Sequence, residues 1–298
     1  MLISLGYLTY GEMKTSLEKT KKWLQQGRVN IADSRFEQVL TNLELLCTWH
    51  DQKRIPELLS NVGNELVIAT LKETMPFIQI YEQFNNLKPH QSIPFSKLKK
   101  VIGGVFLTKN EDAVTNEARN ILFELELAAM LKKRGLKITG FDDVEFQLGD
   151  AHCRIQCKRP MTSRAVSRNI DEALKQLQAG FTDESDKNVG IIALSIDKIL
   201  DVSTRIIKTK NDKSLEKFIE KEMVGFCDRF SEYWARIVDP RVVAVIVVLK
   251  YVVEMEGRLS TGIYSVISVP QFHPMVEARN TQRLSILRQA LSGRLAPA

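Results

Sequence analysis

The stretch DDVEFQLGDAHCRIQCKR, residues 142–159, decides how the rest of this chain is interpreted. Apolar and polar residues alternate on both sides of Gly149-Asp150, a pattern typical of two strands joined by a tight turn. The apolar positions of the two predicted strands are Val144, Phe146, Leu148, Cys153, Ile155 and Cys157. A period of two with one apolar side predicts an antiparallel hairpin with one buried face.

The polar face of this predicted hairpin gathers side chains of different chemistry. Asp143 stands near the start of the first strand, while Gln156 and Lys158 stand near the end of the second. Because these two ends are neighbours in an antiparallel hairpin, we expect a carboxylate, an amide and an ammonium in one small area.

Such a group of side chains suits the hydrolysis of phosphodiesters. Mg²⁺ prefers oxygen ligands, and Asp143, Gln156 and the backbone carbonyl of Cys157 can supply them. Lys158 can then polarise the attacking water or stabilise the charge that develops on phosphorus. The alternative is an ordinary solvated face, because mixed charges are common on exposed sheets.

The composition is that of a globular protein with a modest excess of positive charge. Of the 298 residues, 44% are hydrophobic and 26% are charged, enough for one large domain or two ordinary ones. The formal net charge of +6 favours a polyanionic partner only slightly.

The cysteines and the termini indicate a cytoplasmic protein. The chain has 4 cysteines without a CxxC pair, so we expect free thiols in a reducing compartment and no structural zinc. The N-terminus lacks the basic start and the apolar core of a secretory signal. The longest apolar run, residues 242–249, is too short to span a bilayer, so no membrane partner is expected.

The first third of the chain is predicted to be helical and to form its own domain, residues 1–108. A capping box at Ser34-x-x-Glu37 and a proline at position 56 indicate helix starts, and further helices are expected at 15–24 and 95–102. The polar residues 108–112 indicate the boundary to a second domain, 109–298. No chemical motif is evident before this boundary, so structural support is the default role, with contact to nucleic acid or to a protein left open.

After the boundary, helices and strands follow one another in a mixed α/β (α+β) order. The hydrophobic pattern predicts a helix at 116–134, a strand at 136–139, the hairpin, a helix at 163–179 and a strand at 189–196. The same pattern predicts additions at 213–238 (helix), 242–254 and 261–269 (strands) and 276–291 (helix). On the predicted helix at 116–134, Glu117 and Glu124 share one side, whereas Glu126 is expected to be solvated.

The predicted helix at 163–179 carries a basic stripe. Arg164, Arg168 and Lys175 lie within about 40° of one another from the helical period. A solvated face explains such a stripe as well as a phosphate-binding surface does.

These residues together resemble the PD-(D/E)XK nuclease superfamily, which has the restriction-endonuclease-like fold. The resemblance rests on the helix, three strands, helix, strand order, on Phe123-Glu124 before the hairpin, and on Gln156-Cys157-Lys158. It covers residues 116–196 and is closest to Mrr-like and related restriction or defence nucleases, in which Gln-x-Lys can replace Glu-x-Lys.

The resemblance implies a role for each matched residue. Asp143 corresponds to the central metal ligand, Gln156 to the second ligand, and Lys158 to the residue that orients the attacking water. Glu124 completes the metal shell or hydrogen-bonds to a metal-bound water, with Glu117 as its substitute. Asp142 is the fallback for Asp143, because a slip of one residue exchanges the two faces of a strand. The residues expected to contact phosphates are Arg159, Arg164, Arg168 and Lys175.

The implied function is a Mg²⁺-dependent DNA endonuclease, with Mn²⁺ as a second usable ion, in prokaryotic restriction or anti-phage defence. A homodimer and an operon-encoded partner such as an ATPase fit that function. Gln156 departs from the acidic residue usual at its position and removes one negative charge from the site. The alternative is therefore a catalytically weakened nuclease-fold module that binds nucleic acid or a partner protein.

Overall fold

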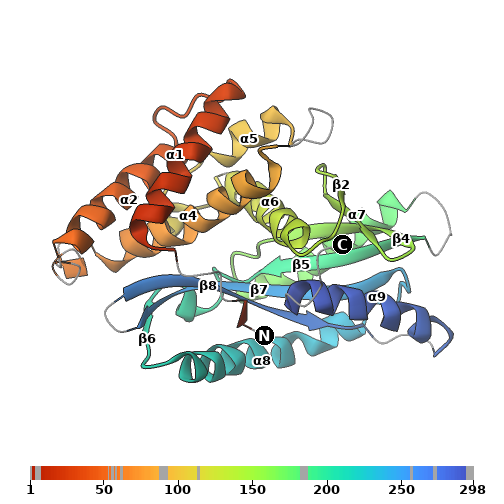
Figure 1. Ribbon diagram of the computed structural model, residues 1–298. Coiled ribbons are helices and arrows are strands. Elements are labelled where there is room, and N and C mark those ends of the chain that lie inside the picture. The colour runs from red at the N-terminus through yellow and green to blue at the C-terminus, as the bar shows by residue number, and fades with distance from the viewer. Residues whose placement is uncertain are drawn as a thin grey trace.

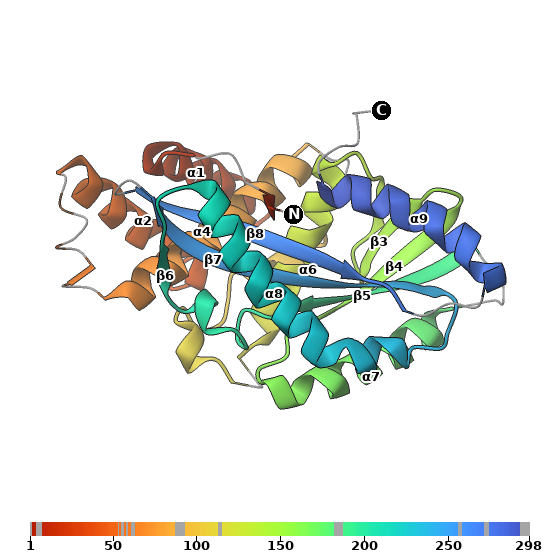
Figure 2. The same ribbon diagram turned by 90° about the horizontal axis from the view of Figure 1, so that it is seen from below.

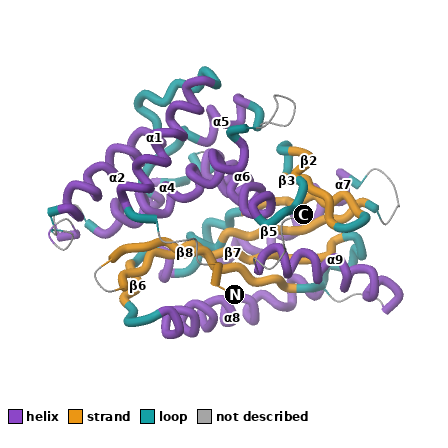
Figure 3. Tube along the Cα trace, in the orientation of Figure 1, coloured by secondary structure: helices purple, strands orange, loops and turns teal. Residues whose placement is uncertain are grey.

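The protein is a mixed α/β structure built on one mixed sheet (Figures 1 and 3). The computed structural model describes residues 2–3, 8–52, 54, 57, 59–60, 63–86, 93–112, 115–181, 187–255, 258–270 and 274–292. Within these ranges the chain forms eight α-helices. The helix start predicted at Pro56 lies outside the described residues.

The first helices form a layer above the sheet in Figure 1. The layer consists of α1 (Tyr10–Gln26), α2 (Arg35–Asp51), α4 (Asn64–Phe84) and α5 (Phe95–Val101). At the start of α2, the Ser34 hydroxyl accepts a hydrogen bond from the N–H of Glu37, as the predicted cap requires. The Glu37 carboxylate, however, accepts from the N–H of Asp33 at 2.7 Å rather than from that of Ser34.

The sheet has the strand order β1-β8-β7-β5-β4-β3-β2, with β6 paired to β7 outside this path. The bounds are β1 (Leu2–Ile3), β2 (Ile138–Gly140), β3 (Val144–Leu148), β4 (Ala151–Lys158), β5 (Asn188–Ser195), β6 (Ile206–Lys208), β7 (Val242–Met255) and β8 (Arg258–Ser268). Strands β4, β5 and β7 run parallel, whereas β3 is antiparallel to both β2 and β4. The short strands β1 and β6 were not predicted, because two or three residues carry no periodic pattern.

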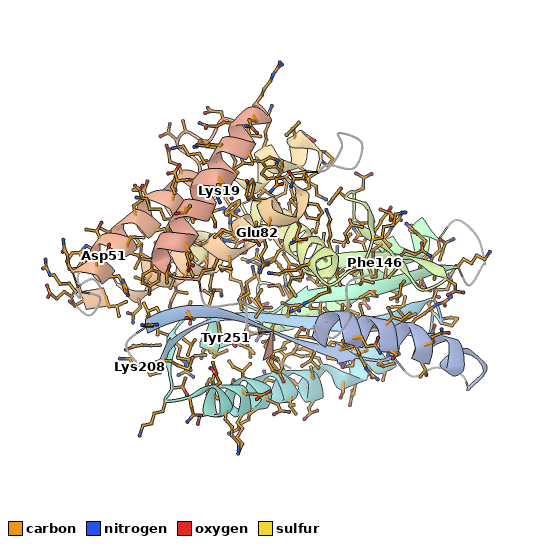
Figure 4. The ribbon with its side chains drawn as sticks, viewed as in Figure 1. Lys19, Asp51, Glu82, Phe146, Lys208 and Tyr251 are labelled. Atoms are coloured by element: carbon orange, nitrogen blue, oxygen red, sulfur yellow. The ribbon has the colours of Figure 1, made fainter. Side chains whose placement is uncertain are left out.

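Helices cover both faces of the sheet (Figures 1 and 2). α6 (Glu117–Lys133) and α9 (Pro274–Ser292) pack on the same face as the helical layer, and α7 (Val166–Gly180) and α8 (Asp212–Ala235) pack on the other. Phe146 belongs to the first apolar core and Tyr251 to the second, on opposite faces of the sheet (Figure 4). No helix in the described part of the chain is both long and apolar enough to cross a bilayer.

The order α6, β2, β3, β4, α7, β5 confirms the predicted sequence of elements. The position of β7 in the sheet explains its nearly all-apolar run at residues 242–249. β7 pairs with β5 on one edge and β8 on the other, and both of its faces are covered by helices, so the strand is buried on all sides.

The predicted boundary near residue 108 does not separate two cores. One hydrophobic cluster runs from Leu17 on α1 through Leu71 on α4 and Leu127 on α6 to Val248 on β7. The helical layer therefore shares this apolar cluster with the sheet, and the division into residues 1–108 and 109–298 stays a prediction. Polar residues 108–112 form the short 3₁₀ helix η2 (Thr108–Asn110) and its exit, which lie over this shared core.

A buried ion network ties the helical layer to α6. The carboxylate of Glu73 on α4 accepts hydrogen bonds from Arg35 on α2 at 2.5 Å and from Arg119 on α6 at 2.6 Å. Burial alone would raise the pKa of Glu73, but the two guanidinium groups outweigh it and lower the pKa to about 2. The carboxylate is therefore ionised at every pH at which the protein is expected to be folded.

We expect the Glu73→Ala substitution to lower the free energy of unfolding by about 3–5 kcal/mol, because it leaves two buried guanidinium groups without their carboxylate. Urea unfolding at neutral pH measures this loss. The matched control is Glu65→Ala, about two helical turns before Glu73 in the same α4. Glu65 pairs with Lys109 at 2.5 Å, but the two side chains are 58% and 59% exposed. There the expected loss is about 0–1 kcal/mol. Equal losses in the two variants would contradict the role given to Glu73.

Candidate functional site

The β3–β4 hairpin brings Asp143 and Gln156 together as predicted. Val144 pairs with Ile155 and Leu148 with Ala151, and the two-residue turn uses Gly149 at a φ of 62°. This register places Asp143, just before β3, opposite Gln156, and the Gln156 side chain is hydrogen-bonded to the Asp143 carboxylate. The fallback residue Asp142 is exposed and is not in this position.

Glu124 reaches the same place from α6. Its carboxylate lies close enough to Asp143 and Lys158 for their charges to shift its pKa. The charges of Asp143 and Lys158 thus act on Glu124, and Gln156 is hydrogen-bonded to Asp143, while the Lys158 ammonium itself contacts Gln176 on α7. Glu117, the predicted substitute, does not join them, because its side chain is 62% exposed and pairs with Lys100 at 2.8 Å.

A fifth residue at this site was missed by the sequence analysis. Lys97, on α5 of the helical layer, pairs with Glu124 at 2.8 Å between Nζ and Oε2. The same ammonium donates to the backbone carbonyls of Phe141 and, at 3.2 Å, of Asp142. Its charge also acts on Asp143. A side chain from the N-terminal third of the chain therefore supplies a cation to the hairpin site.

The two carboxyl groups of the site are both partly withdrawn from water. Burial raises the pKa of Glu124, and Lys97 opposes that shift. Burial likewise raises the pKa of Asp143, against the opposing effects of Arg154, Lys97 and the hydrogen bond from Gln156. Both shifts therefore have burial as their largest cause, and the nearby cations offset it only in part.

Lys158 and Cys157 point to opposite sides of β4, as their alternation predicts. The Lys158 ammonium donates a hydrogen bond of 2.6 Å to the side-chain oxygen of Gln176 on α7. The Cys157 side chain packs against the core on the α6 side. Burial raises the pKa of the Cys157 thiol well above its ordinary value. Because the thiolate is the form that binds metals, Cys157 can offer a metal only its backbone carbonyl oxygen.

The donor set fits a hard divalent cation by its chemistry. Asp143 and Glu124 offer carboxylates and Gln156 an amide oxygen, and Mg²⁺ is commonly bound through one or two carboxylates with carbonyls and waters. In the part of the chain that the structure describes, no three His, Cys, Asp or Glu side chains gather in a metal-binding arrangement. A metal at this site would therefore depend on the amide and backbone oxygens as well as on the two carboxylates.

The four basic residues predicted to contact phosphates separate into two groups. Arg164, on the 3₁₀ helix η3 (Ser163–Ala165), and Arg168 and Lys175, on α7, are exposed. Arg159 is only 8% exposed and donates to Glu111 at 2.8 Å. Its guanidinium group is inside the protein, so it does not belong to the surface that the other three form.

Glu126 corrects a further expectation. Its position on the predicted helix indicates a solvated side chain, but the side chain is 2% exposed and pairs with Lys250 of β7 at 2.6 Å. α6 is covered by α4 on one side and by the sheet on the other, so positions that would be solvated on a surface helix are buried here.

The comparisons with known proteins do not identify the chain. No protein-family model, no curated protein and no solved structure matches it.

We expect the Lys97→Met substitution to lower the free energy of unfolding by about 1.5–3 kcal/mol, because it leaves the partly buried Glu124 without its charged donor. Urea unfolding without added metal measures the effect. α5 and α6 offer a matched control in Lys100→Met, since Lys100 and Glu117 also pair at 2.8 Å but are 58% and 62% exposed. The control is expected to lose about 0–1 kcal/mol. A loss in Lys97→Met no larger than in Lys100→Met would show that Lys97 does not compensate the charge of the site.

Proposed function

We propose that the protein is a metal-dependent DNA endonuclease of the PD-(D/E)XK, restriction-endonuclease-like type, with Mg²⁺ or Mn²⁺ as its cofactor. The observation that supports this function is the hydrogen bond of Gln156 to Asp143 together with the action of the charges of Asp143 and Lys158 on Glu124. These residues come from α6, the start of β3 and the end of β4, and the proposed chemistry needs all three elements in place. Restriction or anti-phage defence in a prokaryote is the proposed context.

Each side chain has a part in this proposal. Asp143 and Glu124 would hold the cation, with Gln156 as a neutral third ligand and the Cys157 carbonyl as a fourth. Such a cation would supply Lewis acidity toward a water and the phosphate. Lys158, fixed by Gln176 on α7, orients the attacking water and offers a positive charge to the scissile phosphate.

The exposed basic residues of α7 suit the backbone of a nucleic acid. Arg168 is 74% exposed, and its only partner of opposite charge among the described residues is Glu172, at 3.7 Å. Arg168 and Lys175 lie on α7 and Arg164 lies just before it, and the same helix contributes Gln176, which fixes Lys158. Since a duplex has two strands to be cut, a homodimer with two such sites is part of the proposal.

The second candidate is a nuclease-fold module that binds nucleic acid or a partner protein without cutting. Lys97 favours it, because an ammonium group already pairs with Glu124 where the first proposal needs a metal ion. Gln156 favours it as well, since the amide contributes no charge toward holding a cation.

We expect the Lys158→Ala substitution to lower the rate of plasmid cleavage at least about 100-fold, the effect typical of losing one group that stabilises transition-state charge. The measurement uses supercoiled plasmid and single-stranded DNA with Mg²⁺ or Mn²⁺, and EDTA as a control. The matched variant is Lys208→Ala, whose side chain on β6 is 79% exposed and remote from the hairpin.

Three outcomes of this experiment have different meanings. Cutting that requires metal and is lost only in Lys158→Ala supports the endonuclease. Cutting that persists in Lys158→Ala contradicts the assignment of the site. Binding of DNA without cutting by the wild-type protein supports the second candidate.

We expect the Arg168→Gln substitution to weaken DNA binding uniformly across sequences. The slope of log K against log salt concentration is expected to fall by about 0.9 if one phosphate contact is lost. The control is Arg236→Gln at the end of α8, because Arg236 is 73% exposed and pairs with Glu232 at 3.6 Å, nearly as Arg168 does with Glu172. An equal change of slope in both variants would indicate general attraction to a basic protein rather than a binding surface on α7.

A further inference from the structure

A second polar region lies inside the protein, apart from the hairpin site. It surrounds a cavity of about 320 Å³ between α4, α6, η2 and the ends of the parallel strands. Arg159 follows β4, Asp197 and Lys198 follow β5, and Lys250 belongs to β7. We call this space the charged cavity.

Basic side chains outnumber acidic ones around the charged cavity. Its buried and half-buried basic lining residues are Lys72, Arg119, Arg159, Lys198 and Lys250, and its buried and half-buried acidic ones are Glu73 and Asp197. Three further side chains pair with these from behind, namely Arg35, Glu111 and Glu126. The described residues of the network therefore hold six basic and four acidic groups, an excess of two positive charges.

The ammonium groups are held inside rather than turned to the solvent. The side chains of Lys72, Lys198 and Lys250 are exposed by only 13%, 17% and 12%. Lys72 lies 3.7 Å from the Asp197 carboxylate, whose other oxygen accepts a hydrogen bond of 2.8 Å from the N–H of Lys250. One carboxylate is thus shared between the ammonium group of Lys72 and the backbone N–H of Lys250.

The neighbouring cations also affect the pKa of Lys72. Burial lowers the pKa of its ammonium, Asp197 opposes that shift, and the neighbouring charges of Lys250 and Arg159 lower the pKa further. Burying a charge without a partner costs free energy, and binding a group of opposite charge offsets that cost.

We infer that the charged cavity binds a small dianion, and specifically the phosphate group of a phosphate monoester. Two negative charges match the excess of two positive ones, and guanidinium and ammonium groups are the donors that bind phosphate best. The remaining lining is apolar, with Ile68, Leu107, Leu122, Phe123 and Met161, and it suits the uncharged body of the same molecule.

The dimensions restrict the ligand to a small molecule. About 320 Å³ is near the lower end of ligand-binding pockets. The basic groups of the charged cavity lie below the surface. The backbone of a duplex therefore does not reach them, in contrast to the exposed Arg168 of the proposed DNA-binding surface. The position agrees with the general rule that ligands of open α/β sheets bind beyond the carboxyl ends of the parallel strands, here β4 and β5.

This inference goes beyond the proposed nuclease activity and does not depend on it. Lys158 and Arg159 are neighbours in the chain, yet Lys158 contacts Gln176 on α7 whereas Arg159 contacts Glu111. The hairpin site and the charged cavity can therefore be tested by separate substitutions.

The test is a titration of the wild-type protein with sodium phosphate, adenosine monophosphate, adenosine, and sodium chloride at matched ionic strength. Thermal unfolding and isothermal titration calorimetry are the readouts. We expect phosphate and the monophosphate to raise the unfolding temperature and to bind one per chain, and adenosine and chloride to do neither. Tighter binding of the monophosphate than of free phosphate identifies a phosphate monoester as the ligand, and the reverse identifies inorganic phosphate.

Three variants locate the binding. Lys72→Met is expected to bind phosphate at least about tenfold more weakly, because one charged donor is lost. Without ligand it is expected to unfold at the same or a higher temperature than the wild type, since Asp197 keeps its contacts with Lys250. Lys208→Met, at the edge of the molecule on β6 (Figure 4), and Lys158→Ala in the hairpin site are expected to bind phosphate as the wild type does.

Two results would overturn the inference. One is a wild-type protein that phosphate and the monophosphate stabilise no more than chloride does. The other is phosphate binding that Lys72→Met retains, or that Lys158→Ala loses, because the bound anion would then lie elsewhere.

Discussion

The structure depends on one buried carboxylate. Glu73, on α4, lies between the guanidinium groups of Arg35 and Arg119, and both contacts are possible only when α2, α4 and α6 are all in place. Hydrophobic contacts tolerate small displacements of one helix on another, whereas a buried ion network loses several kcal/mol when a partner is misplaced, about 3–5 kcal/mol for a missing one. This network therefore fixes the helical layer on α6 more specifically than the apolar core alone.

The same network extends to the end of β4. Arg119 also lies 3.9 Å from Glu111, and Glu111 holds Arg159 directly after the strand. The chain is thus anchored one residue beyond Lys158, and Gln176 fixes Lys158 itself from α7. Because successive residues of a strand point to opposite faces, these two neighbours serve two different sites. The position of the hairpin chemistry therefore depends on helices far away in the sequence, including α5, which supplies Lys97.

The sequence predicts what is local and misses what is not. Alternation of apolar residues predicts the β3–β4 hairpin, its turn at Gly149 and the meeting of Asp143 with Gln156, because strand pairing through a two-residue turn leaves one register. Lys97 and Glu124 are 27 positions apart on different helices, and no period connects them. The burial of Glu126 and Arg159 was missed for the same reason. Their neighbours are set by tertiary packing, whereas an isolated amphipathic helix or loop assigns charged residues to solvent.

Charge balance distinguishes the two sites. At the hairpin site, the three carboxylates of Glu124, Asp143 and Glu145 interact with the three cations of Lys97, Arg154 and Lys158. A divalent cation added to this balanced set leaves an excess of positive charge, which the phosphates of a nucleic acid can neutralise. In the proposed nuclease, metal and substrate therefore strengthen each other's binding, and thermodynamic linkage makes the two effects equal. The charged cavity has its positive excess without any metal, so an anion alone can complete it.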